Sequence, residues 1–179
     1  MNIWENAVIT SKGIALLTKL LEGTSLTITK VVTGAGYVTP GLLQQQTAIS
    51  DPKQTLAIRP VIYPEEGKCA LPVSLTNEAL TSGYTAMQIG CYAMDPDEGE
   101  ILYFIAQAET GTGTIIPSVS EMPGYSAEWT FYFQYGQADS VEVVVDPSGT
   151  VTREEMGAFI DSEFATITKA EIDSAFTES

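Results

Sequence analysis

The sequence contains no histidine, and this absence removes the side chain that most often serves as a general base or as a neutral metal ligand. The catalytic triads that depend on imidazole are excluded with it. Only two cysteines are present, Cys69 and Cys91, which are too few for a disulfide scaffold and lack the companions of a zinc motif. We therefore expect buried free thiols, no cofactor or metal, and a protein that is not an enzyme.

Positive charge is also scarce, because 8 lysines and arginines stand against 23 aspartates and glutamates, for a net charge of −15. Such a surface repels phosphate backbones, so we expect no nucleic-acid partner. No stretch reaches the roughly 18 apolar residues of a membrane span, and the N-terminus lacks the features of a signal peptide. We expect a soluble protein made in the cytoplasm, with no membrane partner.

What the sequence does contain is enough apolar material for a folded chain, at 44% hydrophobic residues. Apolar residues recur at helical spacing over residues 12–21 and Gly23 follows as a stop signal, which predicts a short amphipathic helix. The β-branched, alternating stretch 26–32 predicts a strand that enters a glycine turn. Residues 41–49 are predicted to form one or two helical turns that lie across a sheet.

From residue 55 onwards, apolar runs alternate with turn-forming residues, and no segment between the runs is long enough for a helix. This pattern favours antiparallel pairing and predicts a β-sandwich or an open barrel. We expect the segment 85–108 to form a hairpin and residues 111–123 a loop. The predicted strands are residues 55–62, 68–76, 84–93, 100–108, 127–135 and 140–145.

The pattern changes near Gly149. Thr152 and Thr168 are each followed three residues later by a glutamate, and these two capping boxes predict two successive helices. Helices this short are marginal in isolation, so the tail either folds back onto the body or packs against other chains. Their apolar series is Met156, Phe159, Ile160, Phe164, Ile167, Ile172 and Phe176. The predicted fold is α+β and mainly β, with an N-terminal helix, a β-rich domain over 1–149 and a two-helix tail over 150–179 for oligomerisation or docking.

Two clusters admit a chemical role. The first is an acidic turn that could form a calcium site or a glycosidase-like pair, but its spacing lacks a calcium ligand ladder and a solvated hairpin turn explains it better. The second is an alternating aromatic run that could stack sugars, although a core strand with one apolar face explains it more simply. The acidic turn comprises Asp95, Asp97, Glu98 and Glu100, and the aromatic run comprises Trp129, Phe131, Phe133 and Tyr135.

Three stretches stand in a distinctive order. Residues 5–17 combine a strand, a T-x-x-G motif and a helix, and residues 26–36 run as a threonine-rich strand into G-x-G. Residues 87–106 contain Gln-Ile-Gly-Cys-Tyr-Ala, an acidic turn and Leu-Tyr-Phe-Ile-Ala, and are followed by Ile-Pro at 116–117. An exit strand leads to Thr152. In this order the stretches resemble the N-terminal, baseplate-proximal domain of bacteriophage tail fibres of the tail-collar type, found also in prophages and phage-tail-like bacteriocins.

The resemblance covers about residues 5–153 and has two departures. Gln88 stands where the family usually has an acidic residue, and the repetitive shaft and receptor-binding tip that usually follow are missing after Thr152. Host recognition is therefore not carried over. The resemblance implies a homotrimeric structural component of a phage or phage-like tail, which joins the baseplate to a fibre or neighbouring protein and takes no small-molecule substrate.

Under this hypothesis the apolar tail residues meet sister chains about a threefold axis or insert into a partner's groove. Contacts on the baseplate side are expected at Trp4, Ile14, Leu17 and Leu21. The alternative hypothesis is a carbohydrate-binding β-sandwich module for host cell-surface recognition, which would use exposed tyrosine and tryptophan side chains between residues 125 and 135.

Overall fold

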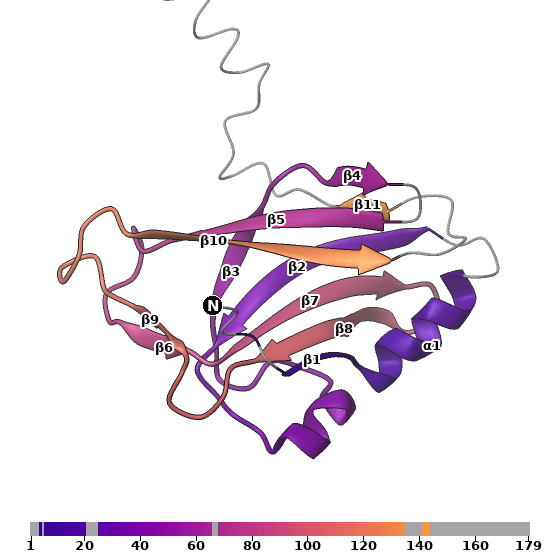
Figure 1. Ribbon diagram of the computed structural model, residues 1–179, viewed down its shortest axis with the longest axis horizontal. Helices are drawn as coiled ribbons and strands as arrows, with labels where there is room; N and C mark the ends of the chain where they lie inside the picture. The colour runs from indigo at the N-terminus through magenta and orange to yellow at the C-terminus, as the bar shows by residue number, and fades with distance from the viewer. Residues whose placement is uncertain (1–3, 5, 21–24, 66–67, 135–140, 144–179) are drawn as a thin grey trace, which may run out of the picture. The chain divides into compact units, whose positions relative to one another are not determined.

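The computed structural model describes residues 4, 6–20, 25–65, 68–134 and 141–143 (Figure 1). The chain divides into two units, Met1–Asp146 and Pro147–Ser179. The second unit lies outside the described residues, and with it the predicted tail helices and their apolar residues from Met156 to Phe176. These features, and the domain boundary after residue 149, stay predictions.

The first unit is built mainly of strands. In chain order its elements are β1 (Asn6–Ile9), α1 (Ser11–Leu20), β2 (Leu26–Gly34), the 3-10 helix η1 (Pro40–Gln45), β3 (Pro52–Ile58), β4 (Ile62–Glu65), β5 (Lys68–Thr76), β6 (Tyr84–Ala86), β7 (Gln88–Asp95), β8 (Gly99–Gln107), β9 (Thr114–Ile116), β10 (Ser126–Gln134) and β11 (Val141–Val143). The predicted helix at 12–21 and the predicted strands at 26–32, 68–76, 100–108 and 127–135 are confirmed as α1, β2, β5, β8 and β10.

Nine strands form one sheet in the order β1-β8-β7-β2-β3-β5-β10, with β11 beside β2 and β4 beside β5. The sheet curls so that β5 and β10 turn over β2, β7 and β8 (Figure 1). The Phe131 ring of β10 meets the Phe104 ring of β8 edge to face, with centroids 5.7 Å apart. The mainly β, antiparallel prediction is confirmed, and a half-open barrel describes the fold better than a sandwich because one sheet supplies both walls.

Two predicted strands and one predicted loop are wrong in detail. The strand expected at 55–62 is two strands, β3 and β4, and the break falls at Pro60, which has no N–H to donate to a ladder. The strand expected at 84–93 divides at Met87, because β6 pairs with β9 in a separate ribbon while β7 pairs with β2 and β8. The loop expected at 111–123 therefore contains β9.

The last described strand departs from the antiparallel pattern. β11 was expected to pair antiparallel with its neighbour, but it runs parallel to the start of β2, with Val141 opposite Leu26. It occupies the edge of β2 that β3 does not reach, because β3 pairs only with the far half of β2, from Val31 to Gly34. The chain thus returns to the first long strand of the sheet.

The sheet carries apolar clusters on both faces. Neighbouring residues of β2 point to opposite sides, so Val31 joins the larger cluster inside the curl and Val32 joins the smaller one outside. Leu43 of η1 and Ile49 cover the outer cluster. The predicted helical turns at 41–49 are therefore confirmed as a 3-10 helix that lies across the sheet.

Helix α1 begins at a threonine cap that also ties it to β8. The hydroxyl of Thr10 accepts a hydrogen bond from Gly13 N (3.0 Å) and donates one to the carbonyl of Leu102, while Thr10 N donates to Tyr103 O (3.0 Å). A β-carbon at Gly13 would lie 2.2 Å from Tyr103 O. The T-x-x-G motif therefore fixes the close approach of the helix to the sheet, which places Leu16 and the rest of its inner face in the core.

Candidate interaction surfaces

The motif residues of the central hairpin form a buried amide network. Gln88 Nε2 donates to Gln107 Oε1 (2.7 Å), and Gln88 Oε1 accepts from Ser50 N (2.9 Å). Gln107 also accepts from Val38 N (3.0 Å) and donates to Val38 O (2.8 Å). Gln88 and Gln107 are both neutral, so the polar groups of Gln88 are paired through amide hydrogen bonds without an ion pair. Gln88 and Gln107 thus hold the loops before and after η1 against the sheet.

The acidic turn between β7 and β8 is held by lysines. Lys19 Nζ lies 2.7 Å from Asp95 Oδ1 and 2.7 Å from Asp97 Oδ2, and Asp95 Oδ1 also accepts from the backbone N–H groups of Asp97 (2.8 Å) and Glu98 (3.1 Å). The hydrogen bond from Lys19 holds the pKa of Asp95 below its ordinary value. Lys12 pairs with Glu98, and Lys30 with Glu100. These contacts support the hairpin-turn interpretation and dock α1 on the hairpin.

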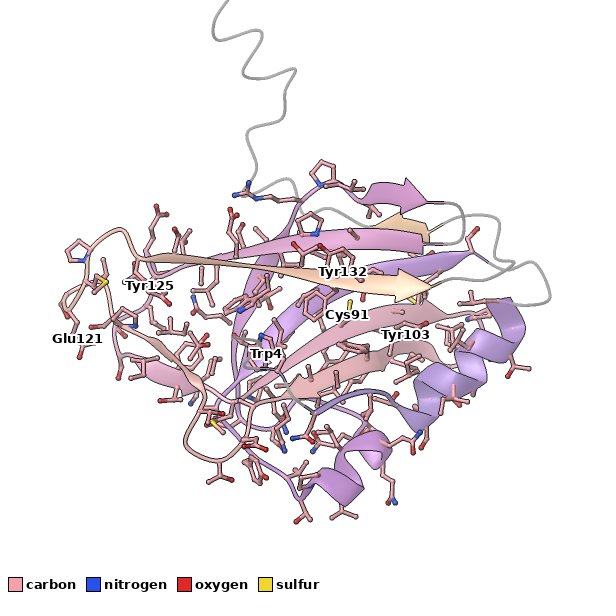
Figure 2. The ribbon with its side chains drawn as sticks, viewed as in Figure 1. Trp4, Cys91, Tyr103, Glu121, Tyr125 and Tyr132 are labelled. Atoms are coloured by element: carbon pink, nitrogen blue, oxygen red, sulfur yellow. The ribbon has the colours of Figure 1, made fainter. Side chains whose placement is uncertain are left out.

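The aromatic run on β10 divides between two faces. Trp129 and Phe131 turn inward and pack against the larger core cluster, while Thr130 and Tyr132 face outward. Figure 2 labels Tyr132 on β10. Its side chain is 77% exposed. The core-strand interpretation of the run is therefore confirmed for Trp129 and Phe131. The side chains of Phe133 and Tyr135 lie outside the described residues.

The four residues expected on the baseplate side occupy different surroundings. Trp4 packs against Trp129, with ring centroids 6.0 Å apart, and Leu17 is partly buried against the larger core cluster. Ile14 is 46% exposed on the outer face of α1. Leu21 lies outside the described residues. The structure therefore leaves Ile14 as the exposed member of the three that it describes.

The first hollow lies along the seam where the half-barrel is open. Within the described residues, β1 pairs only with β8 and β10 only with β5, so each has one unpaired edge. A pocket of about 310 Å³ lies there, and its wall is mainly aromatic. It is lined by Trp4, Ala7, Phe104, Ala106 and residues 129–132. We call this pocket the seam pocket.

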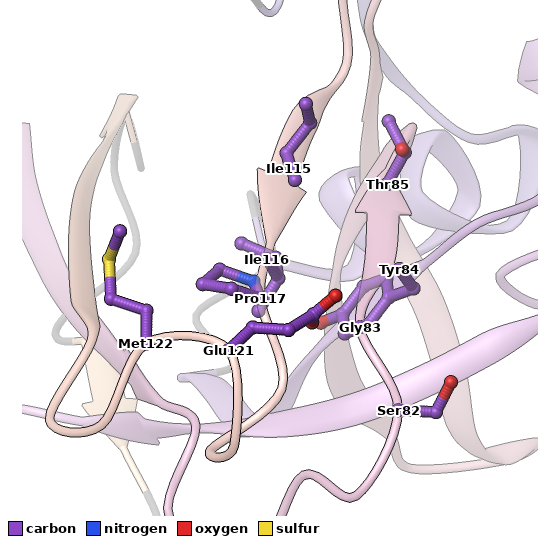
Figure 3. Close-up of a pocket in the computed structure, with 9 residues that line it drawn as sticks. All are labelled: Ser82, Gly83, Tyr84, Thr85, Ile115, Ile116, Pro117, Glu121 and Met122. Carbon is purple, nitrogen blue, oxygen red and sulfur yellow. The ribbon is translucent and has the colours of Figure 1, made fainter.

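The second hollow, of about 460 Å³, lies on the β6–β9 ribbon and is called the ribbon groove (Figure 3). Neighbouring isoleucines of β9 point in opposite directions, since Ile116 is fully buried and Ile115 is 73% exposed. Met122 (53% exposed) forms part of the wall, and Val119 (37% exposed) lies in the same loop. The groove is lined by Ser82, Gly83, Tyr84, Thr85, Ile115, Ile116, Pro117, Glu121 and Met122.

Buried polar contacts fix the walls of the ribbon groove. Asn77 is fully buried, and its Nδ2 donates to the carbonyls of Pro117 (3.0 Å), Ser118 (3.1 Å) and Met122 (2.8 Å). Glu121 Oε2 accepts from Ser118 N (2.8 Å) and Ser118 Oγ (2.7 Å), which lowers the pKa of Glu121. The loop that carries the exposed Met122 is therefore pinned from both sides, and the groove is preformed.

The opposite wall is anchored to the main sheet through β6. The Tyr84 hydroxyl donates to Gln54 Oε1 (2.9 Å) and shares a hydrogen bond with Thr33 Oγ1 (2.8 Å). Burial raises the pKa of Tyr84, so this phenol stays protonated at neutral pH. Sequence reasoning missed the groove because it treated residues 111–123 as a loop. The one local signal was the β-branched triplet Thr114-Ile-Ile facing Tyr84-Thr-Ala.

Comparison of the chain with protein-family models, with curated proteins and with solved structures gave no match. No helix within the described ranges is both long enough and apolar enough to cross a membrane. In the same part of the chain, no three histidine, cysteine, aspartate or glutamate side chains gather in a way that could hold a metal ion.

Proposed function

We propose that the protein is a structural component of a phage or phage-like tail, which attaches a fibre or a neighbouring protein to the baseplate through protein–protein contacts. The observation that carries this proposal is that the tail-collar-like stretches contact one another or the same loop in the fold. We call this set of contacts the frame. Thr10 and Gly13 join α1 to β8, and Gln88 of the central hairpin binds Gln107 and the backbone of Ser50. Residues of the first and the central stretch thus depend on one another for packing.

The G-x-G element contributes to the same frame. A β-carbon at Gly34 would lie 2.4 Å from Ser50 O, and one at Gly36 would lie 2.4 Å from Ser50 Cβ. Both glycines are therefore needed for the strand to pass close to the loop that Gln88 also holds. The G-x-G element and Gln88 thus pack on the same loop. This supports a scaffold like that of the tail-collar family, because a chance similarity in three short stretches does not require them to contact a common segment.

The proposal assigns assembly to surfaces outside this frame. We propose homotrimers in which the two-helix tail, through Met156, Phe159 and the apolar residues that follow to Phe176, packs against sister chains or a partner. The chain would then be found at the baseplate or tail-fibre end of the particle. The preformed ribbon groove supports a binding role, since an exposed apolar groove on a rigid wall is a typical feature of protein contacts.

Immunogold electron microscopy tests the location. Tail particles from the bacterium that carries the gene should bind an antibody against this chain at one end of the tail. Particles that are intact and unlabelled, although the chain is expressed, would reject the proposal. Sedimentation of the full chain and of a chain ending at Gly149 tests the tail, and an unchanged oligomeric state with undiminished partner binding would remove residues 150–179 from the assembly.

A second candidate function is carbohydrate binding, and the seam pocket is the observation that favours it. Its aromatic walls and the exposed ring of Tyr132 offer apolar faces to a sugar. A glycan array distinguishes the two functions. Specific glycan binding that is lost in Tyr132→Ala would favour this candidate, and an array without specific binding would reject it.

A further inference from the structure

We propose that the ribbon groove binds a segment of a partner protein in which apolar side chains are flanked by lysine or arginine. The inference deepens the proposed attachment function and rests on it, because it names the surface and the chemistry of the partner. It is carried by two independent observations, which are the apolar side chains that the groove exposes and the distribution of charge around it.

The apolar part of the argument concerns Ile115, Val119 and Met122. Ile115 (73% exposed) and Met122 (53% exposed) line the same groove, so they form an apolar patch and not single exposed residues. The exposure is not a result of looseness, since Asn77 and Tyr84 fix the two walls through partly buried hydrogen bonds. A partner that covers these side chains removes apolar surface from water without reorganising the groove.

The charge part of the argument begins with the cations. Each lysine or arginine whose side chain the structure describes is paired with an acid away from the groove. The pairs are Lys12–Glu98, Lys19–Asp95, Lys30–Glu100, Lys53–Asp51 and Arg59–Glu128. The sequence then contains no further lysine or arginine between Lys68 and Arg153, a range that includes both strands of the ribbon.

Three acids whose side chains the structure describes remain outside these pairs. Glu78 follows Asn77 before β6, Glu109 precedes β9, and Glu121 lines the groove itself. Within the described part of the chain, none of the three forms an ion pair. An apolar groove that has Glu121 in its lining, on a stretch of sequence without lysine or arginine, is complementary to a basic, apolar segment. A second copy of this chain would instead bring like charges together at the same groove.

The test uses the full chain and three fluorescently labelled probes of equal length, measured by fluorescence anisotropy. One short peptide alternates lysine with leucine, the second replaces lysine with glutamate, and the third replaces leucine with serine. We expect the lysine–leucine peptide to bind best, and its affinity to fall as salt is raised, because the charges are exposed and screened. Equal binding of the lysine and glutamate peptides would overturn the proposal.

Matched variants locate the binding. Ile115→Ser should weaken the lysine–leucine peptide about tenfold, because the contact loses the burial of a largely exposed isoleucine. Ile62→Ser is the control, since Ile62 is also well exposed (57%) but lies on β4. Glu121→Gln, which keeps an oxygen to accept from Ser118, should reduce the salt dependence, whereas Glu98→Gln, on the β7–β8 turn, should not. Equal weakening by Ile115→Ser and Ile62→Ser would refute the assignment to the groove.

Two further outcomes bear on the proposal. Self-association of the free chain that disappears in Ile115→Ser, seen by sedimentation, would make a second copy the occupant and overturn the basic-partner inference. Gold-labelled tails together with absent peptide binding would reject the groove assignment alone. Peptide binding at Ile115 together with unlabelled tails would reject the tail function and leave the groove's chemistry intact.

Discussion

The contact between Gly13 and Tyr103 predicts that Gly13→Ala destabilises the fold, even though alanine is the better helix former. A β-carbon at this position would lie 2.2 Å from the carbonyl oxygen of Tyr103 and 2.7 Å from Ile9 Cγ2. The carbonyl is fixed because it accepts the hydrogen bond from Thr10 N. The helix must therefore shift away from β8, and such overpacking costs about 1–3 kcal/mol.

Helix propensity opposes this cost. Replacing glycine by alanine inside a helix stabilises by about 1 kcal/mol at most, so an overpacking cost at the upper end of that range leaves a net loss of about 2 kcal/mol. In a domain of this size that loss corresponds to a fall in Tm of about 4–8 °C. Gly41→Ala is the control, because nothing lies within 4 Å of the added carbon there. Its free energy of unfolding should stay within about 0.5 kcal/mol of the parent.

Denaturant unfolding followed by circular dichroism measures both variants. If Gly13→Ala is as stable as the parent or more stable, the gain in helix propensity outweighs the cost of overpacking, and the close packing of α1 on β8 is refuted. A loss shared equally by Gly41→Ala would point to a general effect of removing glycine and would refute the argument as well.

Three other substitutions test the buried polar contacts. Because the pKa of Asp95 is lowered in the folded state, its stabilisation is present above the ordinary carboxyl pKa of about 3.9 and is lost as the pH falls through the folded pKa. Asp95→Asn should therefore lower the free energy of unfolding at neutral pH. The difference between parent and variant should disappear as the pH falls below about 4. A difference that is the same at every pH would contradict the ion pair with Lys19. Gln88→Glu places a buried carboxylate against Gln107 Oε1 and should cost about 2–4 kcal/mol at neutral pH. Part of that loss should be recovered on acidification, as seen in unfolding curves, because the protonated carboxyl donates again, and no recovery would argue against the pair. Asn77→Ala removes three donated hydrogen bonds and should lower the free energy of unfolding by about 2–3 kcal/mol. Slower groove-dependent peptide binding is an independent readout. A neutral effect would show that the loop does not depend on Asn77.

The elements that the sequence predicted well are those whose signals are local. The helix at 11–20 has its cap, its apolar spacing and its glycine stop within a few residues, and β5 is bounded by turn residues at both ends. β11 shows the limit of such signals. The alternation at Val141–Val143 indicates a strand, but the direction of its pairing depends on β2, which lies more than a hundred residues earlier in the chain.

The ribbon groove could not be predicted from the sequence for a similar reason. Ile115 and Ile116 are chemically identical neighbours, and local propensity assigns the same environment to both. One is buried and the other is 73% exposed because Tyr84 pairs with Ile116 in the ribbon, and the Tyr84 hydroxyl is held by Thr33 and Gln54. The exposed side of β9 is thus decided by contacts from β2 and β3, which no window around residue 115 contains.

The distribution of charge connects the frame to the binding surface. Lys12 and Lys19 of α1 and Lys30 of β2 neutralise the acidic turn between β7 and β8, which joins α1 and β2 to the hairpin. These cations are engaged there, and Glu121 in the lining of the ribbon groove forms no ion pair within the described residues. The net charge of −15 is therefore not a uniform repulsive shell. It is cancelled at the turn that docks α1 and left in place at Glu121 in the groove, where, under the proposal above, it favours a basic partner and disfavours a second copy of the chain at that surface.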